Sequence, residues 1–137
     1  MGVYFDDLDA FGILHNARYL LLFERTLGSF WEGLGIGQPD RVRAKEGGEG
    51  DHWHLVRANH IDYLRPVRGS GRIRVRIHVQ TLGTTSMTIG FRLLPMDHDE
   101  DFATGHRVLV CVDPSTQRPV PWSDRFRALM APWLVQP

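Results

Sequence analysis

One apolar segment near the N-terminus constrains the fold of this chain more than any other feature. Residues 16–34 place apolar side chains on more than one helical face, and Gly33 and Gly35 mark the end of the segment. A helix that is apolar nearly all round is buried inside a protein and does not lie on its surface. Because Asn16 is a suitable N-cap residue, the pattern predicts one long buried helix from about residue 16 to about residue 34.

Beyond residue 52 the sequence changes to the alternation that is typical of β-strands. The alternation is clearest over residues 72–79, where inward Ile73, Val75, Ile77 and Val79 are interleaved with outward Arg72, Arg74, Arg76 and His78. This pattern indicates a sheet with one buried face. The predicted strands are residues 3–6, 53–63, 72–79, 86–94 and 102–112, and a short terminal helix is predicted over 123–131. We therefore predict one α+β domain over residues 1–137, in which a curved antiparallel sheet wraps around the one long central helix.

Composition does not favour several classes of function. The chain of 137 residues is long enough to bury a core, and its formal net charge of zero does not favour a nucleic-acid or membrane surface. No basic segment followed by an apolar one opens the chain, and no apolar stretch approaches the ~20 residues that span a bilayer. We expect a soluble cytoplasmic protein without nucleic-acid or membrane partners, in which the single cysteine, Cys111, is a buried core residue.

A polar cluster directly before the predicted helix is the strongest candidate for chemistry. Asp6, Asp7 and Asp9 are followed by Gly12, and the pair His15–Asn16 opens the helix. A carboxylate before a helix N-terminus can build a hydrolytic site, because unpaired N–H groups and the helix dipole polarise a carbonyl group. From spacing alone, Asp9 could equally be the acceptor of a turn.

The same segment carries a resemblance to a known family. The run Asp7-Leu8-Asp9-Ala10-Phe11-Gly12-Ile13-Leu14-His15-Asn16-Ala17-Arg18-Tyr19 resembles the opening motif of the hotdog-fold acyl-CoA thioesterases, most closely their 4-hydroxybenzoyl-CoA thioesterase-like branch. That branch shows Asp-x-Asp-x-x-Gly and then an aromatic residue early in the helix. Residues 63–69, 82–86 and 118–122 are similar to later turns of the family. The resemblance implies a hotdog fold.

The resemblance also implies a site and an assembly. The second aspartate of the motif, Asp9, would act as nucleophile or as general base on water, and backbone N–H groups at the helix start would polarise the thioester carbonyl. Gly12 would allow a tight turn and a close approach of the thioester. The family forms dimers with the two sheets joined edge to edge, often paired again as tetramers, and coenzyme A runs along the interface. No metal or other cofactor is expected, since the thioester is already an activated acyl group and coenzyme A is part of the substrate.

Two residues at the predicted helix entry have open roles. His15 is a candidate acid, base or substrate contact, or a hydrogen-bonding residue of the helix entry. Many relatives carry His or Tyr where this chain has Asn16, which we expect to cap the helix beside the reacting carbonyl. Tyr19 either belongs to the core or lines the acyl-binding cavity.

Three charged residues are further candidates for substrate binding. Glu24 lies mid-helix among apolar residues, which is unusual for a carboxylate. Another hotdog branch uses a helix glutamate in catalysis, and an ion pair or an interface contact is the alternative. Arg57 and Arg74 are candidates for contact with coenzyme A phosphates, although exposed strand positions are solvated by default.

These observations predict hydrolysis of an acyl-CoA or acyl-carrier-protein thioester. A hotdog enoyl-CoA hydratase is one alternative, but it needs Asp and His in a Gly-Asp-x-Asn-Pro context. Here Asp9 and His15 are one residue too far apart and the Asn-Pro element is absent. A non-catalytic module that binds acyl-CoA or acyl carriers is the other alternative. The presence of Asp9 argues against it, and Asn16 in place of His or Tyr argues for it.

Overall fold

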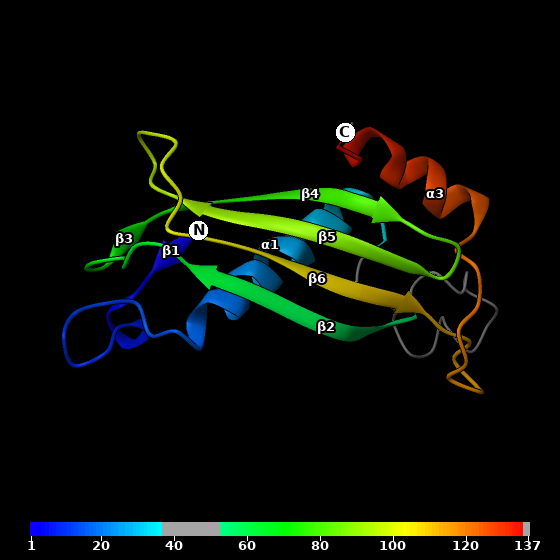
Figure 1. The fold of residues 1–137 in the computed structure, drawn as a ribbon, viewed down its shortest axis with the longest axis horizontal. Coiled ribbons are helices and arrows are strands. Elements are labelled where there is room, and N and C mark those ends of the chain that lie inside the picture. The colour runs from blue at the N-terminus through cyan, green and yellow to red at the C-terminus, as the bar shows by residue number, and fades with distance from the viewer. Residues whose placement is uncertain (37–52, 136–137) are drawn as a thin grey trace.

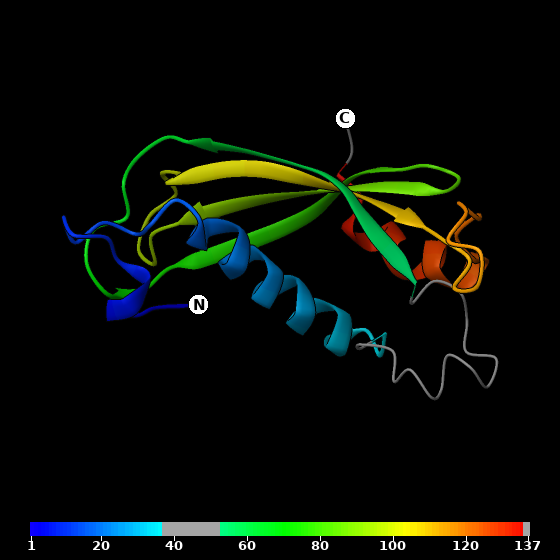
Figure 2. The same cartoon turned by 90° about the horizontal axis from the view of Figure 1, so that it is seen from below.

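An antiparallel sheet with helices on one face forms the body of the protein. The computed structural model describes residues 1–36 and 53–135. Its main sheet has the strand order β2–β6–β5–β4, and β1 pairs with β3 in a separate two-stranded ladder. The strands are β1 (Gly2–Val3), β2 (His54–Tyr63), β3 (Gly71–Arg72), β4 (Arg74–Leu82), β5 (Ser86–Leu94) and β6 (Ala103–Cys111). The helices are η1 (Phe5–Asp7), α1 (Arg18–Gly33), α3 (Asp124–Met130) and η3 (Ala131–Trp133). Figures 1 and 2 show α1 crossing one face of this sheet, with α3 on the same side.

The long strands follow the sequence prediction closely. The predicted strand 86–94 matches β5 in full, and the predicted terminal helix 123–131 matches α3 within one residue at each end. Ile73 and Val79 are buried as their alternation predicts, and Cys111 is fully buried. The first strand is shorter than predicted, because the Asp7 carboxylate accepts a hydrogen bond from the Tyr4 N–H (2.9 Å) and turns the chain into η1.

The prediction of one long central helix enclosed by the sheet is wrong. The longest helix, α1, has 16 residues and begins at Arg18, two residues later than predicted. Its inner face packs on the sheet, whereas Arg25 and Ser29 on its outer face are exposed. The helix is therefore amphipathic and covers one face of the sheet.

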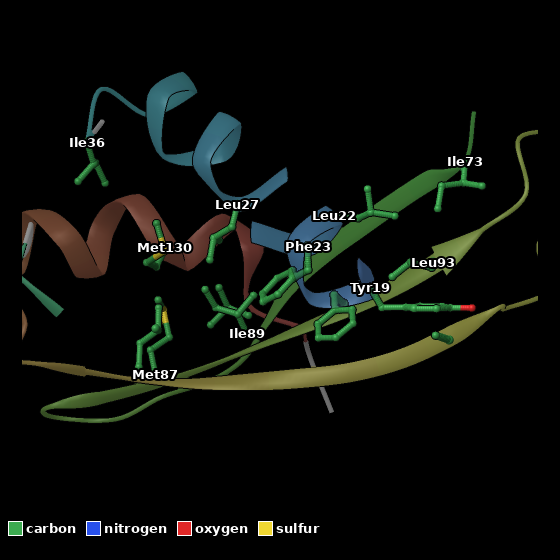
Figure 3. Close-up of a cluster of buried hydrophobic side chains, with 14 of the residues drawn as sticks. Tyr19, Leu22, Phe23, Leu27, Ile36, Ile73, Met87, Ile89, Leu93 and Met130 are labelled. Atoms are coloured by element: carbon green, nitrogen blue, oxygen red, sulfur yellow. The ribbon is translucent and has the colours of Figure 1, made fainter. Parts of the chain in front are cut away.

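The core lies between α1, α3 and the inner face of the sheet. Phe23 of α1 stacks on Phe91 of β5, with ring centroids 4.3 Å apart and an interplanar angle of 19°. Figure 3 shows Phe23 and Leu27 above Ile89, and Met130 of α3 facing Met87. These contacts fix α1 on the sheet and so determine where the N-terminal end of α1 lies.

A glycine in the central strand β6 makes close packing of β2 and β5 possible. A Cβ atom on Gly105 would lie 2.3 Å from the backbone oxygen of His60 and 2.5 Å from the ring of Phe91. We expect Gly105→Ala to lower the free energy of unfolding by about 1–3 kcal/mol, because backbone and ring must both shift. Denaturant unfolding at one fixed protein concentration measures this change.

Gly28 of α1 provides the matched control for this prediction. A Cβ atom there meets no atom within 4 Å, so Gly28→Ala is expected to stabilise by ~0.5–1 kcal/mol through helix propensity. Equal effects of the two substitutions would contradict the register of β6 against β2 and β5.

Candidate active site

The carboxylate of Asp9 is held by the turn that it closes. Its Oδ1 accepts hydrogen bonds from the N–H groups of Phe11 (2.8 Å) and Ile13 (3.1 Å). The Gly12 N–H donates to the Asp9 carbonyl (3.0 Å), and Gly12 adopts a φ of 73°, which favours glycine. Oδ2 accepts no hydrogen bond from the residues that the structure describes. Asp9 therefore has one oxygen that fixes its orientation and another that can meet water or substrate.

Backbone contacts fix this turn against the segment that follows β2. The Leu14 N–H donates to the Val67 carbonyl, and the Gly69 N–H donates to the Gly12 carbonyl, both at 2.8 Å. Asp7, 3% exposed, accepts the His15 N–H at its carbonyl (2.9 Å). The turn is thus attached to the sheet end on one side and to η1 on the other.

The start of α1 differs from the predicted capping arrangement. The cap position is Ala17, not Asn16, and no side chain caps it in the usual way. The imidazole Nδ1 of His15 instead accepts the Ala17 N–H (3.2 Å), and the Asn16 carbonyl accepts the Tyr63 hydroxyl (3.1 Å). The prediction of Asn16 as N-cap is wrong, because the cap position is Ala17 and the side-chain acceptor at the helix start comes from His15.

Most backbone N–H groups between Gly12 and Ala17 already have acceptors. The N–H groups of Gly12, Ile13, Leu14, His15 and Ala17 donate to protein atoms. Within the described part of the chain, Asn16 is the residue of this run whose N–H has no such acceptor. Among these groups, the Asn16 N–H at the entry of α1 is the one without a protein acceptor in the described residues, and its role toward an oxyanion stays a prediction.

A cavity of about 650 Å³ opens beside Asp9. It brings together the predicted residues Asp9, His15, Asn16 and Tyr19, and it adds Phe11, Tyr63, Leu64 and Arg65, which the sequence analysis did not place in the site. The Tyr19 and Tyr63 rings meet edge to face with centroids 4.9 Å apart. Burial raises the pKa of the Tyr19 hydroxyl, so this group stays neutral at physiological pH. The cavity thus combines one carboxylate with aromatic walls.

Four predicted residues do not line this cavity: Gly12, which forms the adjacent turn, and the charged residues Glu24, Arg57 and Arg74. Glu24 contacts Arg107, with Oε1 at 3.0 Å from Nη1. The Arg74 guanidinium binds the Pro95 carbonyl (2.7 Å) and the Asp99 carboxylate (2.7 Å). Arg57 is exposed at an irregularity of β2, where the pairing register with β6 shifts. The roles of these three charged residues toward the substrate stay predictions.

Across residues 1–36 and 53–135, no group of three His, Cys, Asp or Glu side chains is placed to hold a metal ion. In the same part of the chain, no helix has the length and apolar character needed to cross a membrane.

Comparison with protein families agrees with this geometry. A family model described as the thioesterase-like superfamily matches residues 3–130. The chain belongs to this superfamily. The resemblance of the Asp9 motif to hotdog-fold thioesterases is therefore confirmed, and the antiparallel sheet with α1 on one face is the hotdog fold of this family member.

Individual relatives are distant. The uncharacterized protein YsmA of Bacillus subtilis is 23% identical over 124 residues, which cover 90% of this chain and 78% of that protein. The PA5185 protein of Pseudomonas aeruginosa has a similar structure, with a TM-score of 0.84, 24% identity and coverage of 99% of this chain and 90% of that one. A thioesterase of Thermus thermophilus, solved with coenzyme A and Zn, gives a TM-score of 0.75 at 25% identity, covering 100% of this chain and 93% of that chain.

Proposed function

We propose that this protein hydrolyses the thioester of an acyl-CoA or an acyl carrier protein, with Asp9 as the catalytic carboxylate. The observation that carries this proposal is the orientation of Asp9 at the cavity beside the entry of α1. Membership of the thioesterase-like superfamily supports the reaction class. The coenzyme A bound by the Thermus thermophilus relative supports coenzyme A as the thiol part.

Two mechanisms are compatible with the orientation of the Asp9 carboxylate. In the first, Asp9 Oδ2 takes a proton from water, the water oxygen attacks the thioester carbon, and the thiolate leaves and takes that proton. In the second, Oδ2 attacks the carbon, the thiolate leaves, and water then hydrolyses the acyl anhydride. In both, negative charge develops on the former carbonyl oxygen, where the Asn16 N–H is the available donor. One such donor contributes about 3–4 kcal/mol to the transition state in known hydrolases. No cofactor takes part in either scheme.

The open edge of β2 supports the proposed assembly into a homodimer. At the other edge of the sheet, Val79 of β4 pairs with Leu134 and accepts the Val135 N–H. No described segment pairs with the outer edge of β2, and its Leu55 and Val56 are about half exposed. A long unpaired edge with apolar side chains is a template for pairing with another chain. We propose that two β2 strands pair across a two-fold axis, and that such dimers can pair again as tetramers.

Thiol release from a panel of acyl-CoAs and one acyl carrier protein tests the proposed activity. Short, long and aromatic acyl groups are needed, because the cavity alone does not define the acyl group. Turnover of at least one thioester is the expected result. Binding of acyl-CoA without thiol release would instead favour the non-catalytic binding module.

A further inference from the structure

A second cavity lies at the other end of the surface shared by α1 and β2. Its volume is about 560 Å³, within the usual range for small-molecule sites. It opens between the second half of α1, the start of β2 and the middle of β6, and it shares no residue with the Asp9 cavity. The residues that define its character are Glu24, Leu27, Trp31, His54, Arg107 and Leu109.

A buried cation forms one wall of this cavity. The Arg107 side chain is 6% exposed, and its guanidinium lies 4.9 Å above the centre of the Phe23 ring. Its Nε donates to the Asn59 Oδ1 (2.7 Å) and its Nη1 donates to the Glu24 Oε1 (3.0 Å). A guanidinium carries five N–H donors in a planar fork, of which these bonds use two. Arg107 can therefore direct a further N–H at an oxygen atom of a ligand in the cavity.

The remaining lining defines which ligand fits. Trp31, Leu27 and Leu109 provide flat, apolar walls. Two carboxylates, Glu24 and Glu32, flank the single guanidinium, so an acidic group on the ligand would meet net negative charge. The favoured ligand is a flat, uncharged group that carries a neutral oxygen acceptor.

The edge of β2 relates this cavity to the candidate active site. The second cavity is lined by residues at the start of β2, and the Asp9 cavity by Tyr63 at its end. Both cavities lie on the α1 side of the sheet, and β2 is the edge strand at the bottom of Figure 1, opposite β4. Antiparallel pairing of two β2 strands about a two-fold axis sets the start of one strand beside the end of the other, ~5 Å apart. The Asp9 cavity of one subunit then faces the Arg107 cavity of the second.

In the two-subunit site that the family resemblance implies, we propose that Arg107 and the aromatic walls of its cavity select the acyl group of the thioester attacked at Asp9 of the other subunit, and that they favour flat acyl groups with a neutral oxygen acceptor. This inference rests on the proposed thioesterase function. It assigns acyl specificity to Arg107 and to the aromatic walls around it.

Three matched thioesters test the selectivity: cinnamoyl-CoA, 4-hydroxycinnamoyl-CoA and 4-carboxycinnamoyl-CoA. We expect kcat/KM to be highest for the hydroxylated substrate, about tenfold or more above the unsubstituted one, and lowest for the carboxylated one. Arg107→Met should bring the hydroxylated and unsubstituted substrates to within about threefold of each other. A preference that survives Arg107→Met would overturn the assignment.

A second variant keeps the test valid if Arg107→Met does not fold. Gly28 lines the cavity, and a Cβ atom there meets nothing within 4 Å, so Gly28→Leu fills the cavity from a position that has room. We expect it to lower kcat/KM for 4-hydroxycinnamoyl-CoA about tenfold or more. Gly33→Leu is the control, because Gly33 also lies in α1, has equal room for a Cβ atom and does not line the cavity.

Mixed dimers test whether the two cavities belong to one site across the interface. Asp9→Asn and Gly28→Leu chains are unfolded together and refolded at equal amounts. If Asp9 works with the Gly28 cavity of the other subunit, each heterodimer holds one intact site, and about a quarter of the wild-type activity returns. No recovery would overturn the inference.

Wild-type turnover of other thioesters but none of the three cinnamoyl thioesters would also overturn the inference while leaving the proposed function intact. Absence of turnover on every thioester would instead refute the proposed function.

Discussion

Asp9→Asn is expected to lower kcat for the best thioester substrate by ~10²–10⁴-fold, with kcat/KM falling in parallel. The asparagine keeps the Oδ1 acceptor that binds the N–H groups of Phe11 and Ile13, so the turn should persist. What is lost is the charge and basicity of the second oxygen. Steady-state thiol release, with KM and kcat determined separately, measures the effect.

Asp6→Asn is the matched control for this substitution. Asp6 lies in η1, is exposed and does not line the Asp9 cavity, so the same chemical change there should leave kcat within about twofold. Unchanged activity in Asp9→Asn would remove Asp9 from the mechanism. Glu24 would then be the next carboxylate to substitute.

Isotope labelling tests whether Asp9 acts as a nucleophile that forms an anhydride. A single turnover in H₂¹⁸O, with enzyme in excess over substrate, places the label in the free acid if Asp9 acts as a general base on water. If Asp9 is the nucleophile and water attacks the anhydride at the Asp9 carbon, the label enters the Asp9 side chain, and this result identifies the nucleophilic mechanism. Label in the free acid alone shows that water attacked the acyl carbon, either of the thioester or of the anhydride. Mass spectrometry of the peptide that contains Asp9 detects the label that only the nucleophilic mechanism can place there.

The local part of the candidate site could be predicted from the sequence, because one short segment carries it. Asp9 and Gly12 are three residues apart, and the turn that orients the carboxylate is closed by backbone groups inside the same segment. The strand β5 was predicted to its last residue, since alternation on both sides of a short turn leaves little freedom of register.

Contacts between distant segments could not be predicted in the same way. The Tyr63 hydroxyl that binds the Asn16 carbonyl comes from 47 residues away, and the Arg107 partner of Glu24 from 83 residues away. Local sequence presents Asn16 as a cap, but the Tyr63 contact and the His15 imidazole displace it. The apolar pattern of α1 also does not identify what covers each face of the helix: the sheet of the same chain or another surface. The sequence therefore predicts a helix enclosed by the sheet, whereas in the structure the sheet covers only one face of α1.

Among the substitutions predicted to lower stability, Phe23→Ala is expected to have the largest effect, a loss of about 3–5 kcal/mol in the free energy of unfolding. The Phe23 side chain is fully buried, stacks on Phe91 and lies under the Arg107 guanidinium. Truncation leaves a cavity between α1 and the sheet and removes the aromatic surface beneath a buried cation. Chemical denaturation followed by circular dichroism, at one fixed protein concentration, measures the change as a lower midpoint at constant slope.

Phe5→Ala tests whether burial, and not the loss of a phenyl ring as such, causes this effect. Phe5 is 88% exposed, so the same truncation there should change the free energy of unfolding by no more than ~0.5 kcal/mol. The loss of stability caused by Phe23→Leu should lie between these two values, at about 1–1.5 kcal/mol. Leucine keeps most of the buried volume, and such substitutions usually cost less than about 1.5 kcal/mol. If Phe23→Ala and Phe5→Ala lost similar stability, α1 would not be packed on β5 as described. The entry of α1 would then no longer be fixed beside Asp9, and the cavity that supports the proposed chemistry would lose its structural basis.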